Sequence, residues 1–271
     1  MLKLIYRPHT QSKRFPVSPC MVFTLFFFCL HVSAIHATPP SVDPTKLIIG
    51  VSSPTLTQPL IRRLESGLGG VLLIGKVWKQ TTTTRHFIQQ VKKINPTVLI
   101  CVDQEGGPVT RLSFELGTLP SAHHIGQHSS VYDAHRWGLL NGRHLKALGV
   151  DVNFAPVLDV VTTSGNVVIG SRSFGSDPDH VAQLGISYMK GLMDAGILPV
   201  IKHFPGHGDT IADSHHQLPI NHHTMRYLEH VPIAPFYAAI QHGAPAIMLA
   251  HIRYPSKDDK YPASLSTSWI S

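Results

Sequence analysis

Basic, imidazole and acidic side chains are concentrated between Lys202 and His216, where the sequence reads K-H-F-P-G-H-G-D-T-I-A-D-S-H-H. The preceding apolar run, G-I-L-P-V-I at 196–201, is typical of a buried parallel strand. Pro205 and two nearby glycines exclude a continuing helix or a central strand, so the polar side chains belong to a folded-back loop. Because α/β enzymes carry their chemistry in loops that follow parallel strands, this segment is predicted to be a catalytic loop.

Asp213 and His215 are the candidates for acid/base chemistry in this loop. They are two positions apart in a non-helical segment, so the carboxylate can accept a hydrogen bond from one imidazole nitrogen. Such a bond fixes the tautomer of the imidazole and leaves its other nitrogen free to transfer a proton. The pair therefore predicts a general acid/base.

Other interpretations of the histidines stay open. Clustering is expected in a chain with 19 histidines, and a solvated loop is the favoured interpretation for His216, His222 and His223. His203 and His207 have the spacing of zinc ligands on a helix, but Pro205 excludes that helix, and the sequence has no H-E-x-x-H motif or paired cysteines. The Gly-His-Gly around His207 supports a phosphate cradle only weakly. We expect no metal and no cofactor.

The loop resembles the signature of the glycoside hydrolase family 3 β-N-acetylhexosaminidases, which remove N-acetylglucosamine from peptidoglycan fragments. The shared pattern is K-H-F-P-G-H-G-D-T-x-x-D-S-H. The resemblance implies that Lys202 and His203 bind sugar hydroxyls. It also implies that His215 is the acid/base and that Asp213 orients it.

Upstream segments resemble the same family. Asp103 ends the apolar run V-L-I-C-V and opens D-Q-E-G-G-P-V-T-R, which is similar to the family's D-Q-E-G-G-x-V-x-R. The resemblance implies that Asp103 accepts hydrogen bonds from sugar hydroxyls and that Arg111 joins the site. The R-S-F-G segment implies a substrate contact for Arg172, and Asp159 in N-F-A-P-V-L-D is interpreted as a supporting residue. Taken alone, Asp103 would be interpreted as a helix N-cap and Arg172 as a solvated surface residue.

A retaining glycosidase needs a carboxylate nucleophile besides its acid/base. In the family this group is an Asp in an S-D-D segment after the seventh strand, and the present sequence has no such segment. Asp258 and Asp259 are not assigned as substitutes, because K-D-D-K reads as a solvated loop. The chain as written is therefore expected to lack hydrolytic activity. The alternative function is a non-catalytic protein of the same fold that binds amino sugars.

The remaining sequence alternates between strand-like and helix-like segments, which indicates parallel strands joined by crossover helices. Strands are predicted at Leu47–Val51, Val71–Ile74, Val98–Asp103, Val150–Asn153, Leu198–His203 and Ala246–Ala250. Amphipathic helices are predicted at Thr84–Ile94, Tyr132–Leu148, Asp179–Ala195 and Met225–His242. The fold class is therefore α/β, of the (β/α)8 TIM-barrel type, with about six of the eight β/α units.

Residues 1–37 follow the pattern of a signal peptide, with four basic residues before an apolar run at 21–30. The family domain is then expected to cover 38–271, in a periplasmic or secreted protein without a stable membrane anchor after cleavage. A misassigned start would instead give a cytoplasmic protein. The formal charge of +7 is scattered, so we predict a carbohydrate partner and no nucleic acid. Cys101 is expected to be a buried apolar residue.

Overall fold

The computed structural model describes residues 2–6, 22–25, 42–113, 117–163, 165–210 and 218–270, the first two segments as backbone only. The predicted acid/base pair, Asp213 and His215, lies outside the described residues, as does most of the expected leader. In the described part of the chain, no helix combines the length and the apolar character needed to cross a membrane.

A curved sheet forms the centre of the molecule. Its parallel strands follow one another in sequence order: β3 (Ile48–Val51), β4 (Gly70–Leu73), β5 (Leu99–Val102), β8 (Val152–Asn153), β9 (Leu198–Phe204) and β10 (Ala246–Leu249). Beyond β10 the sheet continues with β1 (Leu2–Tyr6) and β2 (Val22–Leu25), both antiparallel to their neighbours. The six parallel strands confirm the predicted α/β architecture.

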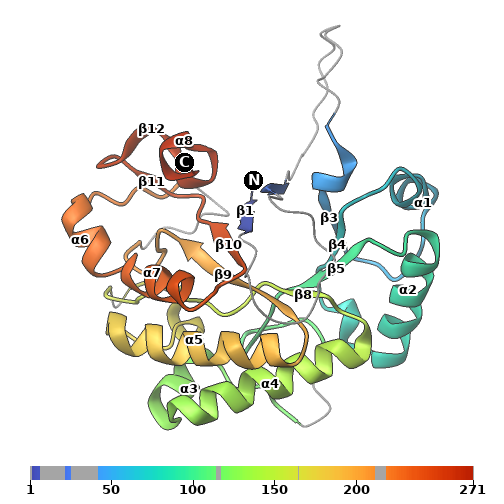
Figure 1. Ribbon diagram of the computed structural model, residues 1–271, viewed down its shortest axis with the longest axis horizontal. Coiled ribbons are helices and arrows are strands. Elements are labelled where there is room, and N and C mark those ends of the chain that lie inside the picture. Colours follow the sequence, from blue (N-terminus) through green and yellow to red (C-terminus); the bar gives the residue numbers. More distant parts are fainter. Residues whose placement is uncertain are drawn as a thin grey trace, which may run out of the picture.

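Helices cover the convex side of this sheet, so that the chain has the shape of an open half-barrel (Figure 1). The α-helices are α1 (Gln58–Glu65), α2 (Thr81–Ile94), α3 (Ala122–His128), α4 (Val131–Leu148), α5 (Pro178–Asp194), α6 (Met225–His230), α7 (Ala234–Gln241) and α8 (Thr267–Ile270). Short 3-10 helices lie at η1 (Pro44–Lys46), η2 (Val77–Lys79), η3 (Gly170–Arg172) and η4 (Ala263–Leu265). Two small hairpins pair β6 (Gln104–Gly106) with β7 (Val109–Thr110), and β11 (Arg253–Tyr254) with β12 (Asp258–Pro262).

Local sequence explains where the two longest helices begin. Ser130 caps α4 by accepting a hydrogen bond from the Asp133 backbone N–H, and the Asp133 carboxylate accepts one from the Ser130 N–H in return. At α5, Asp177 caps the first turn and Pro178 occupies a position where the missing N–H costs nothing. These caps fix both helices relative to the loops that precede them.

The alternation of side chains along each strand builds two apolar layers. In β4, Val71 and Leu73 pack in the cluster beneath the outer helices, whereas Leu72 faces the opposite cluster on the concave side. Cys101 is a buried free cysteine in that concave cluster, as expected from its apolar strand. The period of two continues past the strand ends, so Asp103 and Lys202 lie on the same side as Cys101 and Val200. Strand register thus directs two predicted site residues toward one region.

The structure corrects several expected elements. The helix predicted over 225–242 is divided into α6 and α7, because Pro232 and Pro235 cannot donate the backbone hydrogen bonds of a continuous helix. Helices α1 and α3 were not predicted, and neither was the β6–β7 hairpin. Asp258 and Asp259 begin strand β12 instead of lying in an irregular loop.

Candidate sugar-binding site

The β6–β7 hairpin directly follows Asp103 and is closed by the side chain of Gln104. The Gln104 Oε1 atom accepts from the backbone N–H groups of Arg111 and Leu112 at 2.9 and 3.0 Å, and its Nε2 donates to the Leu112 carbonyl at 3.0 Å. At the turn, Gly106 has φ +100°, and a Cβ there would lie 2.1 Å from the Pro120 carbonyl oxygen. The hairpin therefore has a fixed shape that holds Glu105 next to the end of β5.

Lys202 is the buried cation of the site. Its side chain is 2% exposed, and its Nζ lies 2.7 Å from Asp103 Oδ1 and 2.5 Å from Glu105 Oε1. A lysine this deeply buried is found almost only where its charge is paired. Lys202 thus joins the end of β9 to the end of β5 and to the hairpin.

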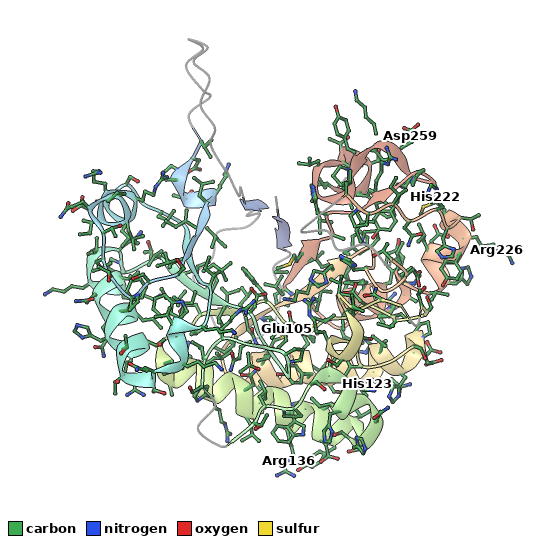
Figure 2. The ribbon with its side chains drawn as sticks, turned by 180° about the vertical axis from the view of Figure 1, so that it is seen from behind. Glu105, His123, Arg136, His222, Arg226 and Asp259 are labelled. Atoms are coloured by element: carbon green, nitrogen blue, oxygen red, sulfur yellow. The ribbon has the colours of Figure 1, made fainter. Side chains whose placement is uncertain are left out.

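Glu105 also forms a bidentate salt bridge with Arg172. The Nε and Nη2 atoms of Arg172 donate to Glu105 Oε2 and Oε1 at 2.8 and 2.9 Å, and Nη1 donates to the Val168 carbonyl at 3.0 Å. Burial alone would raise the pKa of the Glu105 carboxyl, but the charges of Lys202 and Arg172 outweigh it and lower this pKa to about 2. Glu105 is therefore an ionised carboxylate that bridges Lys202 and Arg172. It was not among the site residues predicted from the sequence. Figure 2 shows Glu105 in the middle of the molecule, whereas Arg136 and Arg226 lie at its edge.

His203 is oriented by Asp159, a fully buried carboxylate. The His203 Nδ1 lies 2.6 Å from Asp159 Oδ2, and Asp159 Oδ1 accepts from the backbone N–H groups of His203 and His207 at 3.3 and 2.7 Å. Burial, together with the nearby cations, lowers the pKa of His203 to about 4 despite the Asp159 charge. The imidazole is then neutral at pH 7 and donates from Nδ1, and its Nε2 faces Arg172 Nη2 at 3.4 Å.

The described part of the predicted catalytic loop, up to Thr210, is held against the same cluster. Asn166 Nδ2 donates to the His207 carbonyl at 2.8 Å, and Thr162 donates to the Asp209 carboxylate. At Gly208 a Cβ would lie 1.8 Å from the Val160 carbonyl oxygen, so only glycine permits this approach. The chain therefore enters 211–217, the part with the predicted acid/base pair, from a fixed position beside His203.

The structure brings together four of the five predicted sugar-binding residues. Asp103, Arg172, Lys202 and His203 belong to one cluster, whereas Arg111 makes no ion pair with any carboxylate that the structure describes. Its Nε is buried without a hydrogen-bond partner among the described residues. The side chains of Asp103, Arg172 and His203 are 21%, 15% and 16% exposed, so these three are the members that a ligand can reach.

In the part of the chain that the structure describes, no group of three or more suitable metal ligands occurs. The rings of His203 and His207 lie edge to face with centroids 5.8 Å apart, and His203 uses Nδ1 for Asp159. His222 is exposed at the outer edge of the molecule, away from Glu105 (Figure 2). The site therefore consists of ion-paired and hydrogen-bonding side chains at the carboxyl ends of parallel strands.

A parallel α/β half-barrel with a cluster of charged side chains at the carboxyl ends of its strands has its candidate site where enzymes of the TIM-barrel class hold their site residues. The profile of the glycosyl hydrolase family 3 N terminal domain matches residues 59–271, and the chain belongs to this family. A beta-hexosaminidase of Hydrogenovibrio crunogenus is 36% identical over 216 residues, which are 77% of this chain and 60% of that protein. The chain thus spans about 60% of the length of this curated relative.

Solved structures show the same similarity. A family 3 β-N-acetylglucosaminidase from a Paenibacillus species superposes with a TM-score of 0.78 at 34% identity, covering 82% of this chain and 44% of the other. NagZ from Neisseria gonorrhoeae, in complex with N-trifluoroacetyl-D-glucosamine, superposes with a TM-score of 0.74 at 33% identity, covering 82% and 68%. These matches support the architecture expected from the sequence.

The lowered pKa of His203 predicts a specific loss of stability in mild acid. The unfolded chain takes up this proton near pH 6.5, whereas the folded chain does so only near pH 4. The contribution of His203 to the free energy of unfolding is therefore fully present above pH 6.5. It decreases by up to about 3 kcal/mol as the pH falls toward 4. Urea unfolding at several pH values measures this decrease in the free energy of unfolding. Glu105 contributes in a separate window, because its stabilisation is lost only as the pH falls from 4.5 toward about 2.

A matched pair of variants isolates this effect. His203→Gln removes the titrating group, so its free energy of unfolding should change less between pH 6.5 and 4 than that of the wild type. His222→Gln makes the same substitution at an exposed position and should keep the wild-type pH dependence. Identical curves for the wild type and His203→Gln would show that His203 does not titrate in this way.

Proposed function

We propose that this chain binds terminal, non-reducing N-acetyl-β-glucosaminyl residues, such as those of peptidoglycan fragments, and contributes the acid/base to their hydrolysis. The observation that carries the proposal is the cluster in which Glu105 and Asp159 hold Lys202, Arg172 and His203 at the strand ends. The partly exposed Asp103 carboxylate accepts from sugar hydroxyls, Arg172 offers donors, and the neutral His203 offers an acceptor. The names of the related hexosaminidases and N-acetylglucosaminidases support this substrate class.

The proposed reaction is a double displacement with retention. If a carboxylate nucleophile is supplied from outside the given sequence, it attacks the anomeric carbon while the bond to the leaving oxygen breaks, and His215 gives its proton to that oxygen. His215 then takes a proton from water, the water oxygen attacks the anomeric carbon, and the carboxylate is released. Asp213 keeps the imidazole oriented and stabilises its protonated form. The entry of the loop beside His203 supports this placement of the acid/base.

A non-catalytic function is the second candidate, and a specific observation favours it. The ion-paired cluster is complete among the described residues, so the groups proposed to hold the sugar are in place without the segment 211–217 that contains the predicted acid/base pair. In that case the chain would hold the amino sugar without cleaving it. Binding in the absence of product distinguishes this function from hydrolysis.

One experiment tests binding and turnover together. Purified chain is titrated with N-acetylglucosamine and incubated with an aryl N-acetyl-β-glucosaminide. We expect saturable binding that weakens by about tenfold or more in Arg172→Ala, because a charged hydrogen-bond donor is lost, and no release of the aryl group. The absence of binding would overturn the proposed sugar site.

The control for turnover uses adjacent histidines. If the aryl glycoside is cleaved, His215→Ala should lower the rate by about 10²–10⁴-fold, as expected for loss of a general acid/base. His216→Ala makes the same change one residue further along and should leave the rate unaltered. Equal rates in both variants would remove His215 from the mechanism, whereas the expected difference would favour hydrolysis over binding alone.

We also propose that the N-terminal segment directs export. Basic residues before the apolar run at 21–30 support this reading, as does the sequence A-x-x-A at 34–37, which offers small residues for cleavage. Expression of the full chain in a bacterial host should give periplasmic protein whose N-terminal sequence begins shortly after Ala34 or Ala37. An intact N-terminus in the cytoplasmic fraction would contradict export.

A further inference from the structure

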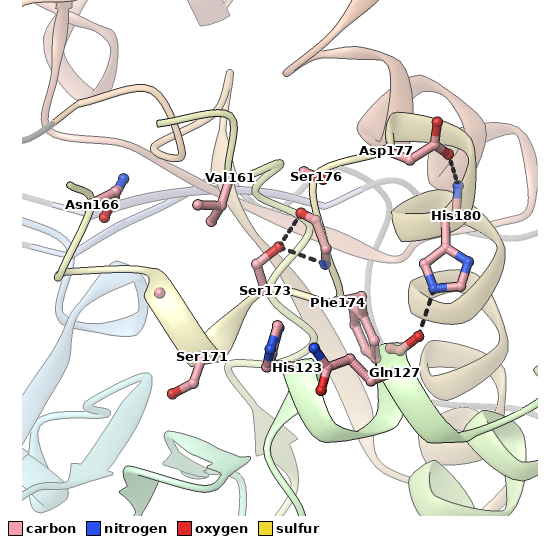
Figure 3. Close-up of a pocket in the computed structure, with 13 residues that line it drawn as sticks. His123, Gln127, Val161, Asn166, Ser171, Ser173, Phe174, Ser176, Asp177 and His180 are labelled. Carbon is pink, nitrogen blue, oxygen red and sulfur yellow. Dashed lines mark hydrogen bonds between the residues drawn. The ribbon is translucent and has the colours of Figure 1, made fainter. Parts of the chain in front are cut away.

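A second cavity lies outside the ion-paired cluster. It has a volume of about 570 Å³, within the range of small-molecule sites, and lies between α3, the loop around η3 and the first turn of α5 (Figure 3). Besides the buried Asn166 and Ser173, its polar lining comes from six residues nearer to solvent: His123, Gln127, Ser171, Ser176, Asp177 and His180. All of these side chains are exposed except that of His180, which is partly buried. A ligand can therefore reach them from solvent.

The loop around η3 separates this cavity from the sugar site proposed above. Ser171 and Ser173 line the cavity, whereas the side chain of Arg172 between them is bonded to Glu105 and does not line it. Ser173 Oγ donates to the Asp159 carbonyl at 2.6 Å and accepts from the Gly175 N–H at 3.1 Å, which fixes this wall. None of the ion-paired cluster residues lines the cavity, so it is a distinct site.

The opposite wall is also held in place by contacts that define the shape of the cavity. A Cβ at Gly126 would lie 1.8 Å from the Phe174 carbonyl oxygen, so α3 packs closely on the loop. His180 Nε2 lies 2.9 Å from the Gly126 carbonyl and donates to it, which fixes the orientation of the imidazole ring. Asp177 uses Oδ1 to cap the His180 N–H at 2.7 Å. The cavity is therefore formed before any ligand binds.

The chemistry of the lining selects a class of ligand. Among the residues that the structure describes, no Lys or Arg side chain lines the cavity, which disfavours phosphate or carboxylate ligands. Metal ions are disfavoured as well, because the described residues contain no group of three suitable ligands. What the lining offers is hydroxyl, amide and imidazole groups that both donate and accept, one carboxylate, and the ring of Phe174. A sugar ring matches it, with hydroxyls around its rim and C–H groups on its faces.

We propose that this cavity is a second saccharide-binding site, which takes a neutral, hydroxyl-rich pyranose such as N-acetylglucosamine. Asp177, Gln127 and the serines bind the hydroxyls, and the imidazole of His180 lies beside them. This site does not require hydrolysis at the strand ends, and its assignment depends only on the residues that line the cavity.

Histidine ring signals in NMR spectra test both sites in one titration of the full chain with N-acetylglucosamine. His123 and His180 report on the cavity, and His203 reports on the ion-paired cluster, with each signal assigned from a single His→Gln variant. We expect the His123 and His180 signals to shift together along a saturable curve. Their failure to shift would overturn the proposal, as would saturation by inorganic phosphate in place of the sugar.

Two matched pairs of variants connect the shifts to the cavity. Ser176→Leu fills the cavity and should abolish the His123 and His180 shifts, whereas Ser256→Leu, at an exposed position outside it, should not. Asp177→Asn keeps the helix cap but weakens a hydrogen bond to the sugar, so affinity should fall about fivefold. Asp179→Asn removes a charge from the same turn without lining the cavity and should have no effect.

The outcomes at the two sites can be told apart. The second site would be overturned if the sugar shifted the His203 signal alone. It would also be overturned if the His123 and His180 shifts persisted unchanged in Ser176→Leu. Either result would leave the proposed function intact. Shifts of His123 and His180 without any response of His203 would support the second site and count against the proposed function.

Discussion

Glu105→Ala is expected to lower the free energy of unfolding by about 3–5 kcal/mol, because it leaves two buried cations without their shared carboxylate. The Lys202 side chain is 2% exposed and that of Arg172 is 15% exposed, so water can replace the lost carboxylate only in part. Urea unfolding measures the change. Glu65→Ala removes an exposed glutamate from α1 and should change stability by no more than about 0.5 kcal/mol.

A second variant keeps this prediction testable if Glu105→Ala does not fold. Glu105→Gln preserves the size of the side chain and one acceptor oxygen, so its loss of stability should be smaller than that of Glu105→Ala. Its affinity for N-acetylglucosamine should still fall, since Lys202 and Arg172 lose the charge that positions them. If Glu105→Ala were as stable as Glu65→Ala, the bridge would have no structural importance.

Much of the fold could be predicted because it depends on local patterns. Apolar runs of strand length located all six parallel strands, and glycines at 149, 196 and 243 marked the ends of helical segments. Helix α1 was missed, although Thr57 caps it and Pro59 occupies its first turn. Those two residues were a usable signal. The division of 225–242 was signalled by Pro232 and Pro235, and the amphipathic pattern across them was misleading.

The candidate site was predicted in part, and the missing part depends on contacts between distant residues. Asp103, Arg172, Lys202 and His203 were selected from motifs, but the sequence could not show what holds them. Glu105 contacts Arg172 from 67 positions away, and Asp159 contacts His203 from 44 positions away. A carboxylate after a strand looks the same in sequence whether it caps a turn, faces solvent or bridges two cations. Only the curvature of the sheet, which brings the ends of β5, β8 and β9 together, distinguishes these cases.

The exposure of the site residues indicates that they have two different roles. Glu105 and Asp159 are almost completely buried, whereas Asp103, Arg172 and His203 keep part of their surface exposed. The buried carboxylates cannot reach a ligand and instead fix the groups that can. Preorganised donors and acceptors of this kind need little rearrangement when a sugar binds. Variants of Asp159 should therefore change the state of His203 as well as the stability of the fold.

Asp159→Ala is expected to destabilise the protein by about 3–5 kcal/mol, because it leaves buried donors of His203 and His207 without their acceptor. Asp159→Asn should cost less, because its amide oxygen can still accept from the backbone N–H groups. Urea unfolding should place the variants in this order, with Asp179→Asn, the same substitution at an exposed position of α5, close to the wild type.

The asparagine variant also has a spectroscopic signature that a general loss of packing would not produce. Its amide NH2 group donates toward His203 Nδ1, which then must accept, so the ring proton moves to Nε2. In the wild type, Nε2 faces the Arg172 guanidinium at 3.4 Å and has no proton to oppose it. In Asp159→Asn, the 15N shift typical of a protonated ring nitrogen should therefore move from Nδ1 to Nε2 of His203. Binding of N-acetylglucosamine should weaken, because the His203 Nε2–H and the Arg172 guanidinium are then two donors that face each other. Unchanged ring shifts in a folded Asp159→Asn protein would show that Asp159 does not set the tautomer, and His203 would then owe its orientation to Arg172.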